Sequence, residues 1–142
     1  MLKIPLWLAA LWWGSLTTIG FIVVPMLFVH LPTPALAGGM AARLFMLQTW
    51  LSVSCGLLVL LSLSRQSSAS PESITGNRAV VTFTVLGVVL ALLSHYVVSP
   101  EIAARENLRL WHSLGSAMFV FQWGCAAATF AKLLPTALKA QV

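Results

Sequence analysis

Four long apolar runs constrain the fold of this chain more than any other feature. They cover approximately residues 4–29, 40–63, 79–98 and 109–134. A run of 18 or more apolar residues predicts a transmembrane helix, because it is long enough to cross the hydrocarbon core of a bilayer. We therefore predict an all-α integral membrane protein in which a single domain, residues 1–142, forms a four-helix bundle from two helical hairpins.

The composition supports this class. Only 8% of the residues are charged and 59% are hydrophobic, whereas soluble domains carry about 25% charged residues. A helix satisfies its backbone hydrogen bonds within one segment, as a lipid environment requires. A membrane β-barrel would need strands of alternating polarity, and the run from Val85 to Leu90 does not alternate. Cys55 and Cys125 fall within the spans, where we expect reduced, apolar thiols.

The basic residues predict the orientation of the hairpins. They are scattered over the connections and both ends, which is typical of charges that meet lipid head groups and predicts no nucleic-acid partner. If the N-terminus is cytoplasmic, that side carries Lys3, Arg65, Arg78, Lys132 and Lys139, and the other side carries Arg43, Arg105 and Arg109. The positive-inside rule then predicts that both termini are cytoplasmic.

The polar side chains gather at one face of the predicted bundle. His30 and Arg43 flank the first turn between spans, and His95 and His112 flank the third. Ionisable groups within a membrane usually face the bundle interior or a wet cavity, so they are candidate functional residues. If the residues just before span four are also helical, five residues that recur at intervals of three or four lie along one face of that helix. These are Glu101, Arg105, Arg109, His112 and Ser116.

Three kinds of chemistry fit this face. We expect His95 and His112 to face each other, and neutral imidazoles ligate metals and haem, with methionines of the same half adding ligands for copper(I). Alternatively, Arg43, Arg105 and Arg109 form a basic pocket for an anionic lipid or metabolite. The histidines and the intervening glutamate could also relay protons in a transporter. The plainer alternative is that these charges only anchor helix ends to head groups.

Several short segments resemble a known family. In the first hairpin they are Trp13-Gly14-Ser15, Gly20-Phe21, the stretch from Val24 to Phe28, Leu31-Pro32, Ala37-Gly38 and Leu44-Phe45. In the second they are Pro100-Glu101-Ile102, Arg105 and the stretch from Trp111 to Ser116. Together they resemble the domain of unknown function 4149 family, a bacterial group similar to eukaryotic transmembrane protein 205.

The resemblance implies a four-helix, multi-pass protein of the bacterial inner (plasma) membrane. It also suggests a distant similarity to copper-resistance-D and protoporphyrinogen-oxidase-J type membrane proteins. In those proteins, histidines in the spans are associated with copper or haem. By that resemblance, His95 and His112 would be the cofactor-binding and metal-binding positions.

We predict a small, non-enzymatic, multi-pass protein with an extracytoplasmic polar pocket for metal, haem or an anionic ligand. The predicted pocket residues, beside the two histidines, are Arg43, Glu101, Arg105, Arg109 and Ser116. No Ser-His-Asp arrangement, nucleotide-binding loop or metal-hydrolase motif is present. One alternative is a haem-dependent membrane oxidoreductase or copper-handling protein that uses the two histidines. Another is a structural subunit that packs in a homo-oligomer or against a membrane partner protein through small-residue tracks, which include Gly14 and Gly87.

Overall fold

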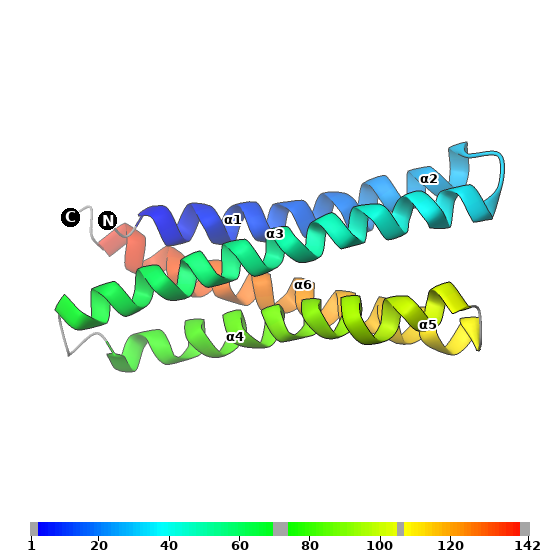
Figure 1. Ribbon diagram of the computed structural model, residues 1–142. Coiled ribbons are helices and arrows are strands. Elements are labelled where there is room, and N and C mark those ends of the chain that lie inside the picture. The colour runs from blue at the N-terminus through cyan, green and yellow to red at the C-terminus, as the bar shows by residue number, and fades with distance from the viewer. Residues whose placement is uncertain (1–2, 70–73, 105–106, 140–142) are drawn as a thin grey trace.

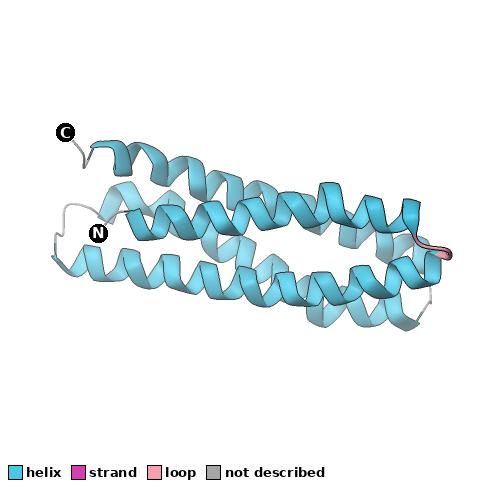
Figure 2. Cartoon of the chain, turned by 90° about the horizontal axis from the view of Figure 1, so that it is seen from above, coloured by secondary structure: helices cyan, strands magenta, loops and turns pink. Residues whose placement is uncertain are grey.

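Nearly all of the described part of the chain is helical, with short turns at residues 31–33 and at Asn107. The computed structural model describes residues 3–69, 74–104 and 107–139. Helical arms run side by side along one axis (Figures 1 and 2). The elements are α1 (Lys3–Thr18), η1 (Ile19–Val23), α2 (Val24–His30), α3 (Pro34–Ala69), α4 (Ile74–Leu93), η3 (Ser94–Val98), α5 (Ser99–Ala104) and α6 (Leu108–Lys139), where η1 and η3 are π-helical.

Four of these helical stretches are long and apolar enough to cross a membrane. They are Lys3–His30, Pro34–Arg65, Arg78–Ala104 and Leu108–Pro135. The predicted all-α bundle of two hairpins is thereby confirmed, and the protein is a multi-pass membrane protein whose surroundings are a lipid bilayer. The side of the membrane on which the termini lie stays a prediction.

The four arms form a closed ring. Both α1 and α4 pack against α3 and α6, which is the arrangement of an up-down-up-down bundle. The beginning of α1 and the end of α6 lie at the same end of the molecule, and the turn between α2 and α3 lies at the other (Figure 1). We call these the terminal end and the turn end.

The core is concentrated in the terminal half. Trp12, Leu16, Cys55 and Ala126 form one buried cluster, and a second lies closer to the termini. Trp12 is fully buried, and a Cβ atom built on Gly87 would lie 2.7 Å from its Cη2 atom. Small residues at such points let helices approach closely.

Gly87 therefore faces the core of its own bundle. Ala91, one turn farther along α4, is also buried. The structure thus corrects the predicted use of this track as a contact surface for a partner protein. Gly14, the other glycine of that prediction, has no atom within 4 Å of a built Cβ.

In one arm of each hairpin, the helix continues past a proline in the same way. A π-helical segment ends two residues before Pro25 in the first arm and two residues before Pro100 in the third. Proline lacks an N–H group and its ring clashes with the carbonyl four residues back. The residue before each proline instead bonds the carbonyl five residues back, as Ser99 does to Ser94. One residue is inserted into the helical turn, and the helix continues past the proline.

The continuation of the helix past Pro100 contradicts one prediction about the third span. The span was expected to end near Val98, with the following residues leading into span four. Instead α5 extends span three to Ala104. The chain then reverses at Asn107, whose φ of 48° is left-handed, a conformation that asparagine tolerates. The predicted stripe from Glu101 to Ser116 is therefore wrong, because Glu101 belongs to a different span.

The second span also begins six residues before the predicted residue 40. Thr33 caps it, because its Oγ1 accepts the backbone N–H of Leu36 at 3.3 Å. Pro34 is the first helical residue, a position where its missing N–H costs nothing. Gly38 and Gly39 lie within α3, although glycine is a poor helix former.

Candidate functional site

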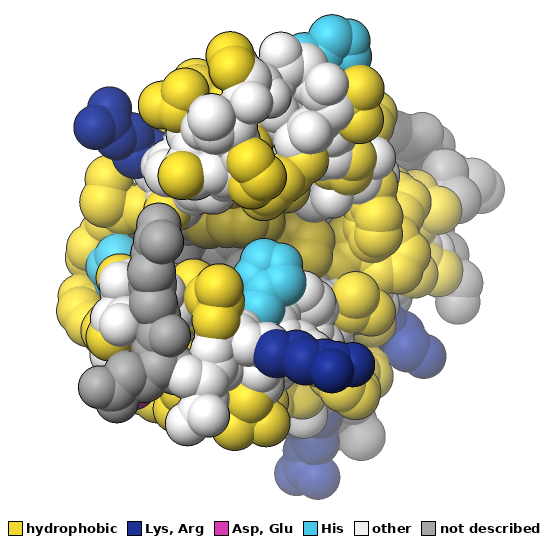
Figure 3. All heavy atoms as spheres, turned by 90° about the vertical axis from the view of Figure 1, so that its right-hand side faces the viewer, with side chains coloured by type: hydrophobic (Ala, Val, Ile, Leu, Met, Phe, Trp, Pro, Cys, Tyr) yellow, Lys and Arg dark blue, Asp and Glu magenta, His cyan; other side chains and the backbone are white. Residues whose placement is uncertain are grey.

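The two hairpins diverge toward the turn end. Neither α2 nor α5 contains a buried residue, and residues 108–121 of α6 are likewise not buried. Helix α2 packs against η1 and α3, whereas α5 packs against η3 and α6. Figure 3 looks onto this end and shows a hollow between the two hairpins, floored by hydrophobic side chains. We call this hollow the opening.

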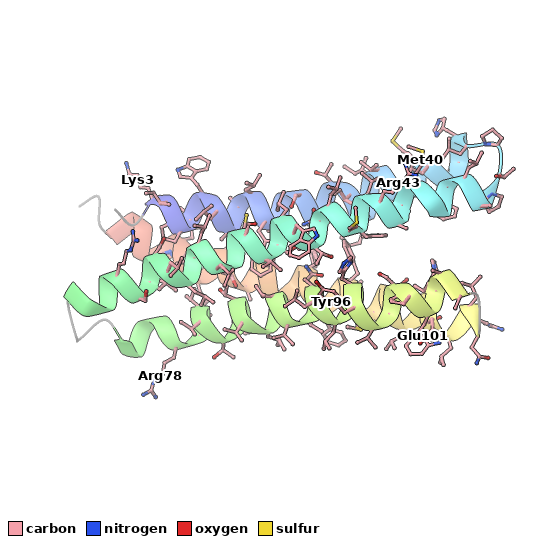
Figure 4. The ribbon with its side chains drawn as sticks, in the orientation of Figure 1. Lys3, Met40, Arg43, Arg78, Tyr96 and Glu101 are labelled. Carbon is pink, nitrogen blue, oxygen red and sulfur yellow. The ribbon has the colours of Figure 1, made fainter. Side chains whose placement is uncertain are left out.

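Basic side chains stand around the turn end. Arg43 on α3, Arg109 in the first turn of α6 and His112 one turn later are exposed. Figure 4 shows Arg43 toward the turn end and Arg78 at the terminal end. Glu101 on α5 is half-buried, and no ion pair is found among the described residues. Arg105, the remaining predicted pocket residue, lies outside the described residues.

A shallow, open depression marks the beginning of α6. It is lined by Asn107, Leu108, Arg109, Leu110 and Ser113. Ser116, a predicted pocket residue, is exposed nearby, but its hydroxyl donates to the backbone carbonyl of His112 at 2.9 Å. The Ser116 hydroxyl is thus engaged within its own helix.

His95 lies deeper than the sequence suggested. It stands nine residues before the end of its span at Ala104, or about 13 Å at 1.5 Å per residue. Its half-buried ring contacts Trp50 on α3 and Tyr96, with ring centroids 6.2 and 4.8 Å away. The span is longer than predicted because α5 continues it, which explains the difference in depth.

His95 and His112 therefore do not meet. A Cβ built on Gly115 would lie 3.2 Å from Val98, so these two residues are level. His95 lies three residues inward from Val98, and His112 lies three residues outward from Gly115, which separates the histidines by about 9 Å in depth. No group of three or more His, Cys, Asp or Glu side chains that could hold a metal ion occurs in the described ranges.

A layer of buried amides and hydroxyls crosses the middle of the bundle. The Gln48 Nε2 donates to Ser15 Oγ at 3.0 Å and to Ser52 Oγ at 3.3 Å. The Gln122 Nε2 donates to Ser52 Oγ at 3.0 Å and so joins the two hairpins. Both glutamines are 3% exposed, and the Gln48 Oε1 has no partner among the described atoms. The four-residue spacing of Gln48 and Ser52 places them on one helical face, whereas no spacing in the sequence joins Gln122 to them.

Aromatic rings cover this amide layer on the side of the opening. Phe45 and Phe119 each precede a glutamine of the layer by three residues, and their ring centroids lie 5.4 Å apart. Phe21 also contacts Phe119 at 6.4 Å. On the terminal side of the layer, Trp12 is fully buried, and Leu16, next to Ser15 of the layer, is fully buried as well. The opening is thus closed at mid-depth, which suits binding from one side of the membrane.

Comparison with known proteins agrees with the sequence resemblance. A family model described as a domain of unknown function, DUF4149, matches residues 7–110. The matched segment includes Arg43, His95, Glu101 and Arg109, and it ends before His112. No curated protein and no solved structure matches the chain. Because the family match covers well over half of the sequence, the chain belongs to the DUF4149 family.

Proposed function

We propose that this membrane protein binds an anionic amphiphile in the opening between its hairpins. The acidic head group would lie at the basic rim formed by Arg43, Arg109 and His112, and the apolar part would lie within the opening. The observation that carries the proposal is the hollow floored by hydrophobic side chains at the end of the bundle where these basic residues are exposed (Figure 3).

The charges at the rim favour an anion over a cation. Arg43 and Arg109 are exposed, and neither forms an ion pair within the described residues. A guanidinium group can hold a phosphate or carboxylate through two parallel hydrogen bonds. Each basic residue near a membrane surface also attracts anionic lipid by about 1 kcal/mol. Two free arginines would therefore raise the affinity for an anionic head group about 30-fold over a neutral one.

The shape of the opening favours an amphiphile over a small soluble anion. The floor is apolar, and the ring pair of Phe45 and Phe119 separates it from the amide layer. Hydrocarbon chains fit such a surface without leaving polar groups unpaired. A free phosphate would use the rim alone and would leave the floor uncovered.

A haem or copper ion held jointly by His95 and His112 is not part of this proposal. The two side chains lie at different depths, and His95 is engaged with Trp50 and Tyr96. The similarity to copper and haem families stays a prediction. So do the extracytoplasmic placement of the opening and the bacterial inner membrane.

The test is a titration of the purified protein in mild detergent with dioctanoyl phosphatidylglycerol, using dioctanoyl phosphatidylcholine as the neutral probe. Bound lipid is counted by native mass spectrometry. We expect Arg43→Gln and Arg109→Gln each to weaken phosphatidylglycerol binding about fivefold, since each removes one charge of about 1 kcal/mol. Arg78→Gln is the matched control, because Arg78 is exposed at the terminal end (Figure 4).

Two results would contradict the proposal. One is equal binding of the anionic and neutral lipids, and the other is an equal loss with Arg78→Gln. An absorption spectrum and metal analysis of the same sample test the alternative that the protein binds haem or copper. A Soret band lost in His112→Ala would replace the amphiphile with haem.

A further inference from the structure

A patch of polar side chains faces the lipid at the seam between α3 and η3. Trp50 and Ser54 on α3 are exposed, Tyr96 on η3 is 61% exposed, and His95 lies half-buried between the rings of Trp50 and Tyr96. Figure 4 shows Tyr96 well inside the length of the bundle. We call these four residues the seam patch.

The seam patch lies at the depth of the hydrocarbon. Tyr96 stands eight residues before the end of its span at Ala104, or about 12 Å inside it. Trp50 lies at the middle of the span Pro34–Arg65. The hydrocarbon core is about 30 Å thick, and lipid chains there offer no hydrogen-bond partner.

The polar atoms of the seam patch have no hydrogen-bond partner in the part of the chain that the structure describes. These atoms are the hydroxyls of Ser54 and Tyr96, the indole N–H of Trp50 and the imidazole nitrogens of His95. Three other hydroxyls in the spans behave differently. Those of Thr18, Ser62 and Thr82 each donate to the backbone carbonyl four residues earlier.

Unpaired polar groups within a bilayer are costly and are usually matched by a partner. We propose that the seam patch is the contact surface between two copies of this chain. It contains both donors and acceptors, because a neutral imidazole offers one of each and a tyrosine hydroxyl can act as either. An acceptor-only ligand, such as a lipid ester, would leave the imidazole acceptor unmatched.

The geometry of a membrane dimer suits this patch. Two copies inserted in the same direction are related by a two-fold axis along the membrane normal, so each residue meets only residues at its own depth. His95 and Tyr96 are adjacent in sequence and differ in depth by about 1.5 Å. His95 of one copy can thus bond the partner's Tyr96, and the symmetry repeats the bond.

Disulfide cross-linking in native membranes tests the contact. A Ser54→Cys variant is made after Cys55→Ala and Cys125→Ala, so that it carries one thiol. Oxidation should give a product of twice the 15.3 kDa monomer mass. Phe121→Cys in the same background is the matched control, because Phe121 is 70% exposed on α6, which packs mainly against α1, α4, η3 and α5 rather than against α3.

A second variant tests the hydrogen bonds themselves. Tyr96→Phe keeps the ring and removes both symmetry-related bonds, so the dimer association constant should fall about tenfold. His95→Ala should act similarly, and Thr82→Val should change nothing. The amount of each variant in the membrane fraction verifies insertion.

Four results would overturn the proposal. They are the absence of a cross-linked dimer, equal cross-linking of Ser54→Cys and Phe121→Cys, a product whose mass reveals a different protein, and full dimerisation of both Tyr96→Phe and His95→Ala.

Discussion

Gly87→Ala should destabilise the bundle, because the added methyl group has no room. A Cβ at this position would lie 2.7 and 2.9 Å from two ring atoms of Trp12 and 3.2 Å from the Cβ of Cys125. Trp12 is fully buried and cannot move into lipid or water. Overpacking of this kind typically costs about 1–3 kcal/mol, and the better helix propensity of alanine returns at most about 1 kcal/mol.

The free energy of unfolding should therefore fall by about 1–2 kcal/mol, which lowers the ratio of folded to unfolded protein about 5- to 30-fold. Reversible unfolding in mixed micelles of a mild detergent and dodecyl sulfate, followed by tryptophan fluorescence and circular dichroism, measures it. Gly124→Ala on α6 is the matched control, because a Cβ there meets nothing within 4 Å. We expect that control to be as stable as the original chain or slightly more so.

A double substitution tests the cause. Trp12→Phe removes the outer ring atoms, Cη2 and Cζ2, that the new methyl group would meet. Gly87→Ala should therefore lower the free energy of unfolding less in the Trp12→Phe background than in the original chain. If Gly87→Ala and Gly124→Ala have the same stability, the close packing of Gly87 against the Trp12 ring is refuted.

Three further changes probe other parts of the fold. Gln122→Leu removes the hydrogen bond to Ser52 and should lower stability in the same micelle assay by about 0.6–2 kcal/mol; unchanged stability would argue against the amide layer. Thr33→Ala removes the cap of α3 and should cost about 1 kcal/mol, seen as faster hydrogen exchange in the first turn of α3 only. Cys55 and Cys125 are 4% and 6% exposed, so neither should react with a maleimide until dodecyl sulfate unfolds the chain, and labelling in mild detergent would contradict their burial.

The sequence was sufficient to predict the spans and their pairing, because both depend on the length of apolar runs and the shortness of the turns. It was less informative about where helices end. Pro100 suggested that the helix ends there, but a π-turn lets the helix continue beyond this proline. The amino-acid composition of the segment does not predict such a turn. Likewise, the pair Thr33-Pro34 was an N-terminal capping signal that the neighbouring glycines obscured.

The depth of the polar residues followed from those same boundaries. Once span three was taken to end near Val98, His95 was placed at the membrane face and opposite His112. The neighbours of His95 depend on how α3 packs against η3. These segments are far apart in the sequence, so local sequence patterns do not predict the contact. Gln48 and Gln122 show the same limit, since Ser52 joins them across two hairpins. Isolated glutamines within apolar runs were the available signal.

The π-turn ahead of each proline gives the two hairpins matching hinges. A turn with one extra residue can migrate along a helix by exchanging carbonyl partners, without breaking the helix. Each such step changes the helical phase of the residues it passes by about 100°. Both hinges lie between the close-packed terminal half and the divergent turn half. The width of the opening can therefore change while the layer around Trp12 stays intact, and the amphiphile proposed above would then enter or leave without unfolding of the core.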